Sequence, residues 1–253
     1  MVRVRRIVPP LVFGLGFLAL WQLIVVAFNL KPYFLPKPTS IFARFFDNID
    51  QVWKVCRVTG GNAFIGLVLG TVLGLAVAFV ASRYRLVGKL ATPMAVAVSA
   101  MPIIVLVSVM NNMFSITSEL PRRLMVAIVT FFIVFINVSK GLSQASSTQL
   151  ELMASYGAND SATIRKVRLP NAVGFLFVAL KQAAPLAVIT SFVAEYFGGR
   201  QNGLGYRIGS SVNGDITSGW AYVLGASLLG LTFYVLALVM ERYIAPWQHR
   251  PAS

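Results

Sequence analysis

Long apolar runs recur along this chain of 253 residues, and charged residues, Pro or Gly bound each run. A helix needs about 20 mostly apolar residues to cross the hydrocarbon core of a bilayer. The candidate spans are residues 9–29, 61–82, 91–112, 124–142, 172–198 and 219–241. No ten-residue alternating pattern indicates a membrane barrel. We therefore expect an all-α membrane protein with about six transmembrane helices, in a single domain over residues 1–253.

The composition agrees with this class. Hydrophobic residues make up 57% of the chain and charged residues 12%, whereas soluble domains are about 45–50% apolar. The first apolar run follows Arg3, Arg5 and Arg6, as the core of a signal peptide would. It is too long for such a core and no small-residue cleavage site follows it, so we expect it to be retained as a span.

Loop Lys and Arg residues predict the orientation of the chain. With the N-terminus inside, the cytoplasmic loops hold more basic residues than the outer loops do. An even number of spans then places both termini in the cytoplasm, together with residues 147–170. The net charge of +14 is dispersed among the loops, which favours anionic lipid headgroups over nucleic acid as the partner.

Several kinds of chemistry have no signature in the sequence. No segment fits the G-x-x-x-x-G-K-[ST] pattern with which a P-loop holds phosphates. The single Cys56 excludes an internal disulfide, and the single His249 excludes a site with several histidines. The spans are also poor in acids and contain no His, which argues against intramembrane proteolysis. We expect no catalytic residues and no metal site.

The polar, basic segment 147–170 carries ordered helix signals. Thr148 and Glu151 have the spacing of a capping box, in which both side chains bond free backbone amides at a helix start. The helix is expected to run to about Tyr156, because Gly157 then suits a left-handed C-terminal cap.

A second short helix is expected after this bend, running to about Val167 and ended by Pro170. The residues available to cap its start are Asn159, Asp160 and Ser161. The apolar positions of the two helices are Leu150, Met153, Ala154, Ile164 and Val167. Arg165, Lys166 and Arg168 would flank this face at the membrane surface. Such order in a cytoplasmic loop is typical of a segment that docks a partner.

The fixed points of this loop are Glu151, Ala154, Gly157 and, after nine residues, Val167 to Pro170. They resemble the EAA loop of binding-protein-dependent ABC importer permeases, whose pattern is E-A-A-x3-G-x9-I-x-L-P. Leu152 and Met153 depart from the family's two alanines, and Val167 stands in place of Ile. These departures concern the fine shape of the docking surface.

Other segments resemble the nitrate, sulfonate and taurine branch of the same family, so that the resemblance covers roughly residues 30–240. They are YFLPKPTS at Tyr33–Ser40, the pair Met101 and Pro102, the pair Ala194 and Glu195, and GLGY at Gly203–Tyr206. The loop motif is specific, and the combination is stronger than any of these segments alone.

The resemblance implies the type I ABC importer permease fold, in the cytoplasmic (inner) membrane of a bacterium. It implies a separate ATP-binding cassette ATPase that carries ATP and Mg²⁺, an extracytoplasmic solute-binding protein, a permease homodimer, and no cofactor on this chain. The expected ATPase-coupling residues are Glu151, Met153, Ala154, Gly157, Ala158, Val167, Leu169 and Pro170. The solute is a small molecule such as nitrate, a sulfonate, taurine, bicarbonate or a vitamin precursor. Two other classes stay open, namely an autonomous secondary transporter and an intramembrane enzyme.

Polar or helix-breaking residues inside spans are costly and therefore mark a candidate translocation path. The candidates are Ser99, Met101, Pro102, Asn111, Gln182, Ser191 and Glu195. Pro102 and Pro185 would kink the third and fifth spans, with or without contact to the solute. Lys181 is expected to extend toward the cytoplasmic surface. Glu195 is expected either to pair with Arg200 or Arg207 or to meet the binding protein.

Two further patterns have a structural and a functional interpretation. Gly66, Gly70 and Gly74 recur at intervals of four in the second span, so this face allows close helix packing inside the subunit or across a dimer. Residues 30–58 are too charged to span, and apolar side chains recur in them at helical spacing. This predicts an amphipathic helix on the outer membrane surface, which either packs at the interface or docks the binding protein.

Overall fold

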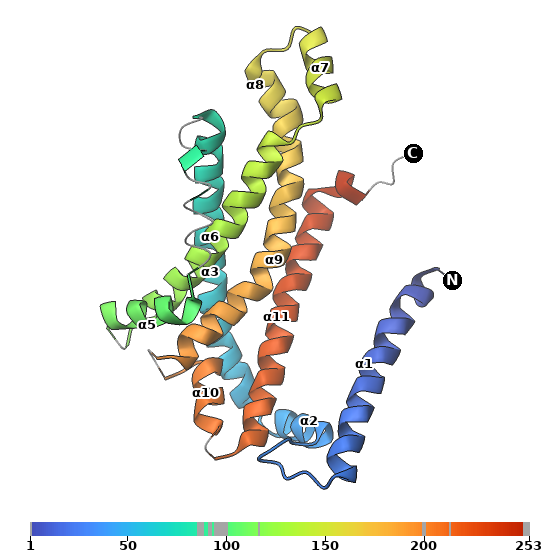
Figure 1. Cartoon of the computed structure of the whole chain (residues 1–253), viewed down its shortest axis with the longest axis vertical. Coiled ribbons are helices and arrows are strands. Elements are labelled where there is room, and N and C mark those ends of the chain that lie inside the picture. The colour runs from blue at the N-terminus through green and yellow to red at the C-terminus, as the bar shows by residue number, and fades with distance from the viewer. Residues whose placement is uncertain are drawn as a thin grey trace.

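The computed structural model describes residues 2–84, 89–90, 93, 101–115, 117–198, 201–212 and 214–249, and all regular structure in these ranges is helical (Figure 1). The helices are α1 (Val2–Ala27), α2 (Pro38–Asp47), α3 (Ile49–Arg83), α5 (Ile103–Met113), α6 (Leu120–Ser143), α7 (Ser147–Ser155), α8 (Asp160–Thr163), α9 (Leu169–Tyr196), α10 (Leu204–Ser211) and α11 (Ile216–Ile244). A π-helical turn, η1 (Ile164–Arg168), joins α8 to α9, and a 3₁₀ turn, η2 (Pro246–His249), follows α11.

Five helical segments among the described residues are long and apolar enough to cross a membrane. They are Val8–Ala27, Ile49–Arg83, Leu120–Ser143, Asp160–Tyr196 and Ile216–Ile244, and they overlap the expected spans 9–29, 61–82, 124–142, 172–198 and 219–241. The expected span 91–112 falls mostly outside the described residues. Its described end lies in α5, which is a shorter apolar helix.

The fifth span begins further upstream than the sequence predicted, because Pro170 does not end a helix. α8, η1 and α9 form one continuous helical run, Asp160–Tyr196. The amide of Leu169 donates to the carbonyl of Ile164, which is the wider register of a π-turn. Pro170 is the second residue of α9 and follows this π-turn directly, so the hydrogen bond that its missing N–H cannot make falls where the helical register changes.

The expected amphipathic helix in residues 30–58 is divided in two. α2 ends at Asn48, whose backbone N–H bonds the carbonyl of Arg44, and α3 begins at the next residue. α2 lies at the end of the bundle opposite α7 and α8 (Figure 1). It buries Ile41 and Phe45, and Phe45 belongs to a core cluster with residues of α3, α10 and α11.

Asp215 caps the start of α11 beside α2. Its Oδ1 accepts from the backbone N–H of Ser218 at 3.1 Å, and its Oδ2 accepts from the Ser218 hydroxyl at 2.6 Å. Arg44 of α2 forms an ion pair with the same carboxylate at 3.1 Å. The pKa of Asp215 is held below its ordinary value by the Ser218 hydroxyl first and, against a partial opposing effect of burial, by backbone N–H groups and Arg44.

The glycine stripe of α3 packs against α6, which confirms that these residues allow close packing inside the subunit. A Cβ on Gly70 would lie 2.6 Å from the Cβ of Thr130, and one on Gly74 would lie 3.0 Å from the carbonyl oxygen of Phe131. Gly66 meets Val126 in the same way. The two backbones are therefore in direct contact, as small residues permit in lipid. α9 packs on the other side of α6, around Phe135, Ala172 and Ala179.

α1 stands apart from the bundle formed by α3, α6, α9 and α11 (Figure 1). It contacts α2, and the ring of Trp21 packs edge-on against Trp220 of α11 at a centroid distance of 5.4 Å. Most of its apolar side chains are exposed, for example Phe13 at 78%. In a membrane this surface faces lipid or another subunit.

Candidate functional site

α7 and α8 form a helical hairpin that projects from one end of the bundle (Figure 1). No residue of either helix is buried. Leu152 is 52% exposed and Tyr156 is 78% exposed. Within the described residues Glu151 makes no side-chain hydrogen bond or ion pair. The hairpin therefore presents both apolar and acidic groups that the rest of the chain does not satisfy.

The hairpin begins at a different cap from the one predicted. Ser146, with extended backbone, is the N-cap of α7, and its hydroxyl accepts from the backbone N–H of Gln149 at 3.1 Å. Ser146 lies two residues before Thr148, so the predicted capping box of Thr148 and Glu151 is wrong. Both residues lie inside the helix, and this leaves the Glu151 carboxylate on the exposed surface of α7.

The bend of the hairpin is confirmed as predicted. Gly157 has φ +64°, and its N–H bonds the carbonyl of Ala154 at 2.9 Å while that of Ala158 bonds Met153 at 3.0 Å. This pair of bonds is a Schellman motif, which requires the left-handed conformation that glycine adopts without strain. The Oδ1 of Asn159 then caps α8 by accepting from Ala162 at 2.8 Å.

The expected coupling residues divide between the tip and the root of the hairpin. Glu151, Ala154 and Gly157 are exposed at the tip, where Met153 and Ala158 are partly buried. The root residues Val167 and Leu169 are partly buried, and Pro170 is exposed. The root is continuous with α9, so the tip is attached to the longest apolar run in the described chain.

Pro102 is the N-cap of α5, with φ −61° and ψ 118°. Most of the residues before it in the expected span 91–112 lie outside the described ranges, so the kink expected there stays a prediction. Met101 and Pro102 are both exposed, and Ser99 lies outside the described residues. Pro185 does lie inside α9, which bends partway along its length (Figure 1).

The candidates on α9 lie in two different environments. Gln182 is exposed on a face that also carries Val178, Leu186 and Ile189. Ser191 and Glu195, by contrast, are 0% and 2% exposed. Asn111 of α5 is partly buried and donates its amide to the carbonyl of Ala194 at 3.4 Å. Gln182 thus lies on the surface of the chain, whereas Ser191 and Glu195 are enclosed within it.

Glu195 lies in a buried polar network at the end of the bundle opposite the hairpin. Its Oε2 accepts from the Thr59 hydroxyl at 2.8 Å and from the backbone N–H of Gly205 at 3.1 Å. The Thr59 hydroxyl oxygen also accepts from the backbone N–H of Leu204 at 3.0 Å. A Cβ on Gly203 would collide with the Glu195 carboxylate. The GLGY segment is thus folded directly onto Glu195.

Within the described residues Glu195 forms no ion pair with Arg207, whereas the expected pairing with Arg200 is not tested. The cationic partner of Glu195 there is Arg122 of α6, whose Nη1 lies 3.9 Å from Glu195 Oε1 and whose side chain is 1% exposed. Arg200 lies outside the described residues, and Arg207 is exposed on α10. The sequence placed Arg122 in an outer loop because it precedes the apolar run, but α6 begins at Leu120 and carries it into the interior.

Glu119 extends this network toward α3. Its carboxylate accepts from Arg122 Nη1, Asn202 Nδ2 and Asn62 Nδ2, each at 2.7 Å. Arg123 Nε also donates to Asn62 Oδ1 at 3.0 Å. Burial raises the pKa of Glu119, but the amide of Asn202, the Arg122 charge and the amide of Asn62 together hold it below its ordinary value. Sequence reasoning missed this cluster, although the Glu-Leu-Pro-Arg-Arg run at a helix start was a visible signal.

The expected extension of Lys181 toward the cytoplasmic surface stays a prediction, and in the structure its side chain is held by a neighbouring helix. Its Nζ donates to both carboxylate oxygens of Glu241, at 2.8 and 2.7 Å, and so joins α9 to α11. Glu241 is 5% exposed. A buried charge without a partner costs far more free energy than a paired one. This explains why the Lys181 side chain turns toward Glu241 of the neighbouring helix.

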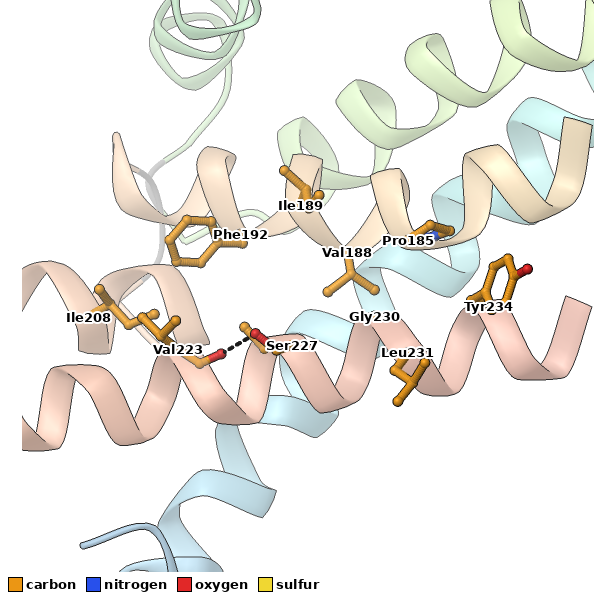
Figure 2. A pocket seen from close by; sticks show the side chains of 11 residues that line it. Pro185, Val188, Ile189, Phe192, Ile208, Val223, Ser227, Gly230, Leu231 and Tyr234 are labelled. Atoms are coloured by element: carbon orange, nitrogen blue, oxygen red, sulfur yellow. Dashed lines mark hydrogen bonds between the residues drawn. The ribbon is translucent and has the colours of Figure 1, made fainter. Parts of the chain in front are cut away.

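A cavity of about 470 Å³ lies between α9 and α11 (Figure 2). Its lining is almost entirely apolar and includes Pro185, Phe192 and Leu231. Ser227 donates its hydroxyl to the carbonyl of Val223 at 3.0 Å and is therefore already satisfied. This cavity suits apolar chains and offers little to a polar solute.

A family model described as "Binding-protein-dependent transport system inner membrane component" matches residues 70–250. The chain belongs to this family. Its members are permease subunits of ABC importers, in which ATP hydrolysis lies in a separate partner. The assignment makes the chain a multi-pass inner-membrane protein, and it decides against both an autonomous secondary transporter and an intramembrane enzyme.

Curated relatives of this permease match nearly its whole length. The formylaminopyrimidine transport permease protein ThiX of Halalkalibacterium halodurans is 27% identical, covering 99% of this chain and 100% of the relative. The putative aliphatic sulfonates transport permease protein SsuC of Escherichia coli is 26% identical, covering 95% and 92%. A solved structure of an amino acid ABC transporter with histidines has the same fold, with a TM-score of 0.63 at 16% identity, covering 78% of this chain and 96% of that chain.

Proposed function

We propose that this permease is driven by ATPase subunits that dock on the α7–α8 hairpin, and that two copies of the chain enclose the solute path. The observation that carries the proposal is the hairpin itself, in which no residue of α7 or α8 is buried and which is held by three caps at Ser146, Gly157 and Asn159. Fixing an exposed hairpin costs conformational entropy. A rigid, exposed projection is what a docking element requires.

The geometry supplies a route from this hairpin to the path. α8, η1 and α9 are one continuous helical run, so a displacement of the hairpin moves α9 with it. α9 carries Gln182 on its accessible face and Glu195 at its far end. ATP and Mg²⁺ bind to the partner ATPase in this proposal, and this chain needs no cofactor of its own.

The hairpin and both termini face the cytoplasm in this proposal. α3, α6 and α11 end on the hairpin side of the bundle (Figure 1), and their last turns carry Arg83, Lys140 and Arg242 respectively. η1 adds three more basic residues. Such a concentration favours the cytoplasmic side. The opposite end, with α2 and α10, then faces the solute-binding protein.

The second copy is proposed to cover the accessible face of α9, with α1 packed against lipid or the partner. Val178, Leu186 and Ile189 leave an apolar strip there with Gln182 as its polar group. The described cations deep in the structure are already engaged, since Lys181 pairs with Glu241 and Arg122 with Glu119. We propose that the solute carries no permanent negative charge, in keeping with a formylaminopyrimidine more than with a sulfonate.

The coupling proposal is tested by reconstituting the permease with its ATPase and binding protein in proteoliposomes. Gly157→Val forces a β-branched residue into the left-handed region, and Glu151→Lys reverses the exposed charge. Both variants are expected to reduce ATP-driven uptake and copurification of the ATPase at least about tenfold, the effect of 1.4 kcal/mol. Ser161→Ala, an exposed change in α8, is the matched control and should leave both unchanged.

Uptake that survives both substitutions, with ATP turnover still coupled, would show that the hairpin is not the docking element. The solute proposal has a separate readout. Uncharged heteroaromatic solutes and sulfonates are supplied with the binding protein, and Gln182→Ala is compared with Leu186→Ala on the same face. Uptake of a sulfonate alone would contradict the proposed solute class and leave the coupling result intact.

A further inference from the structure

A second pocket, of about 300 Å³, lies where the end of α3 meets α8 and η1. Two arginines line it from different elements, Arg83 from the last turn of α3 and Arg168 from η1. Within the described residues neither has a carboxylate at ion-pair distance. Asp160 also lines the pocket, so the charged side chains of the lining leave one positive charge in excess.

Among the described lining side chains, these two arginines supply the hydrogen-bond donors that are available to a ligand. The Ser82 hydroxyl is committed to the carbonyl of Phe79 at 2.8 Å, and the Thr163 hydroxyl is committed to that of Asn159 at 3.2 Å. Guanidinium groups present several N–H donors in a planar fork that matches phosphate oxygens. The ligand that completes this lining is an anion with several acceptor oxygens.

The remaining walls of the pocket are apolar. Phe79 of α3 is 41% exposed and Ile164 of η1 is 39% exposed, beside the buried Leu142 at the end of α6. A soluble anion gains nothing from such walls, whereas a phosphate that carries glycerol and acyl chains buries apolar surface against them. The pocket also lies at the ends of two apolar spans, the level of lipid headgroups.

We propose that this pocket binds the phosphodiester headgroup of an anionic phospholipid of the cytoplasmic leaflet. Arg83 and Arg168 donate to the phosphate oxygens, Phe79 and Ile164 contact the glycerol and upper acyl carbons, and Asp160 accepts from a headgroup hydroxyl. Because Asp160 and Ile164 belong to the helical run that leads from the bend of the hairpin into α9, bound lipid holds this part of the hairpin against α3. This last consequence and the choice of leaflet rest on the proposed function, whereas binding itself does not.

Binding is measured on the full-length permease by native mass spectrometry with phosphatidylglycerol, in the absence of ATPase. Arg83→Gln with Arg168→Gln removes the two donors. Arg165→Gln with Lys166→Gln removes the same charge from exposed residues of η1 outside the pocket. The pocket variant is expected to lose at least about tenfold in affinity, since a hydrogen bond to a charged group contributes a factor of ten or more. The matched variant should change less than about twofold.

Three results would overturn the proposal. Equal losses in both double variants would assign binding to diffuse surface charge, and no loss in either would remove the pocket from the binding site. Displacement of the lipid by inorganic phosphate alone would make a soluble anion the ligand. The thermal unfolding of both variants without added lipid is compared first, so that a folding defect is not taken for a binding defect. Lipid binding can fail while coupling through the hairpin persists, and coupling can fail while lipid binding persists. The two proposals are therefore tested separately.

Discussion

Replacing Glu195 by alanine is expected to destabilise the permease by about 3–6 kcal/mol. The estimate follows from the two buried hydrogen bonds that Glu195 Oε2 accepts, from Thr59 at 2.8 Å and Gly205 at 3.1 Å. A hydrogen bond to a charged group contributes about 1.5–3 kcal/mol. Alanine removes both and leaves a hydroxyl and a backbone N–H buried without this acceptor.

Glu195→Gln is the discriminating variant. Its amide oxygen can replace Oε2, and its nitrogen then takes the place of Oε1, which accepts no hydrogen bond among the described residues. The substitution removes the ion pair between Glu195 and Arg122, whose atoms lie 3.9 Å apart. Arg122 keeps its ion pair with Glu119 at 2.7 Å. We therefore expect Glu195→Gln to cost clearly less than Glu195→Ala, because both hydrogen bonds to the position of Oε2 are kept.

The comparison is made by unfolding purified permease with SDS in mixed micelles, followed by tryptophan fluorescence. ATP-driven uptake is measured in parallel, because a loosened GLGY segment should reduce transport in Glu195→Ala more than in Glu195→Gln. If Glu195→Gln cost as much as Glu195→Ala, the ion pair with Arg122 would dominate, and the reasoning from hydrogen bonds would be refuted.

Two further predictions follow from packing and capping. Gly70→Ala should destabilise by about 1–3 kcal/mol through overpacking against α6, whereas Gly61→Ala on the same helix, with open space at its Cβ, should be neutral or stabilising. Equal SDS unfolding curves would contradict the close contact. Asp215 has a pKa lowered below its ordinary 3.8, first by the Ser218 hydroxyl, so its stabilising effect is complete above that pH and is lost as pH falls through the lowered value. Unfolding measured against pH should show this loss of stability at acid pH in the wild type and not in Asp215→Asn, which retains a capping side chain. Identical pH profiles for the two proteins would contradict the stabilising role of the Asp215 charge.

Local chemistry made the hairpin predictable. Gly157 and Asn159 act through bonds that span only a few residues, so their roles follow from residue type and spacing. The start of α7 was missed because Ser146 and Thr148 can both cap a helix, and the path of the chain before the helix selects Ser146. The continuation through Pro170 was missed because a π-turn is not encoded in a simple helical period.

The buried charges were not predictable in this way. Glu195 had several arginines available, and its pairing with Arg122 depends on how α6 and the GLGY segment approach α9 in space. Lys181 and Glu241 lie 60 residues apart in sequence. Helix periodicity places each of these residues on a helix but not the helices beside one another, so such partners emerge only from the packed structure.

The contact of α3 with α6 also restricts how the permease can change shape. Val126, Thr130 and Val134 of α6 lie directly over Gly66, Gly70 and Gly74, so sliding along this seam would drive these side chains into the larger residues between the glycines. The packing of α11 against its neighbours is looser, since apolar cavities of about 470 and 440 Å³ lie along this helix. Alternation between inward-open and outward-open states is thus expected to proceed by movement of α11 against an α3–α6 pair that behaves as one solid body.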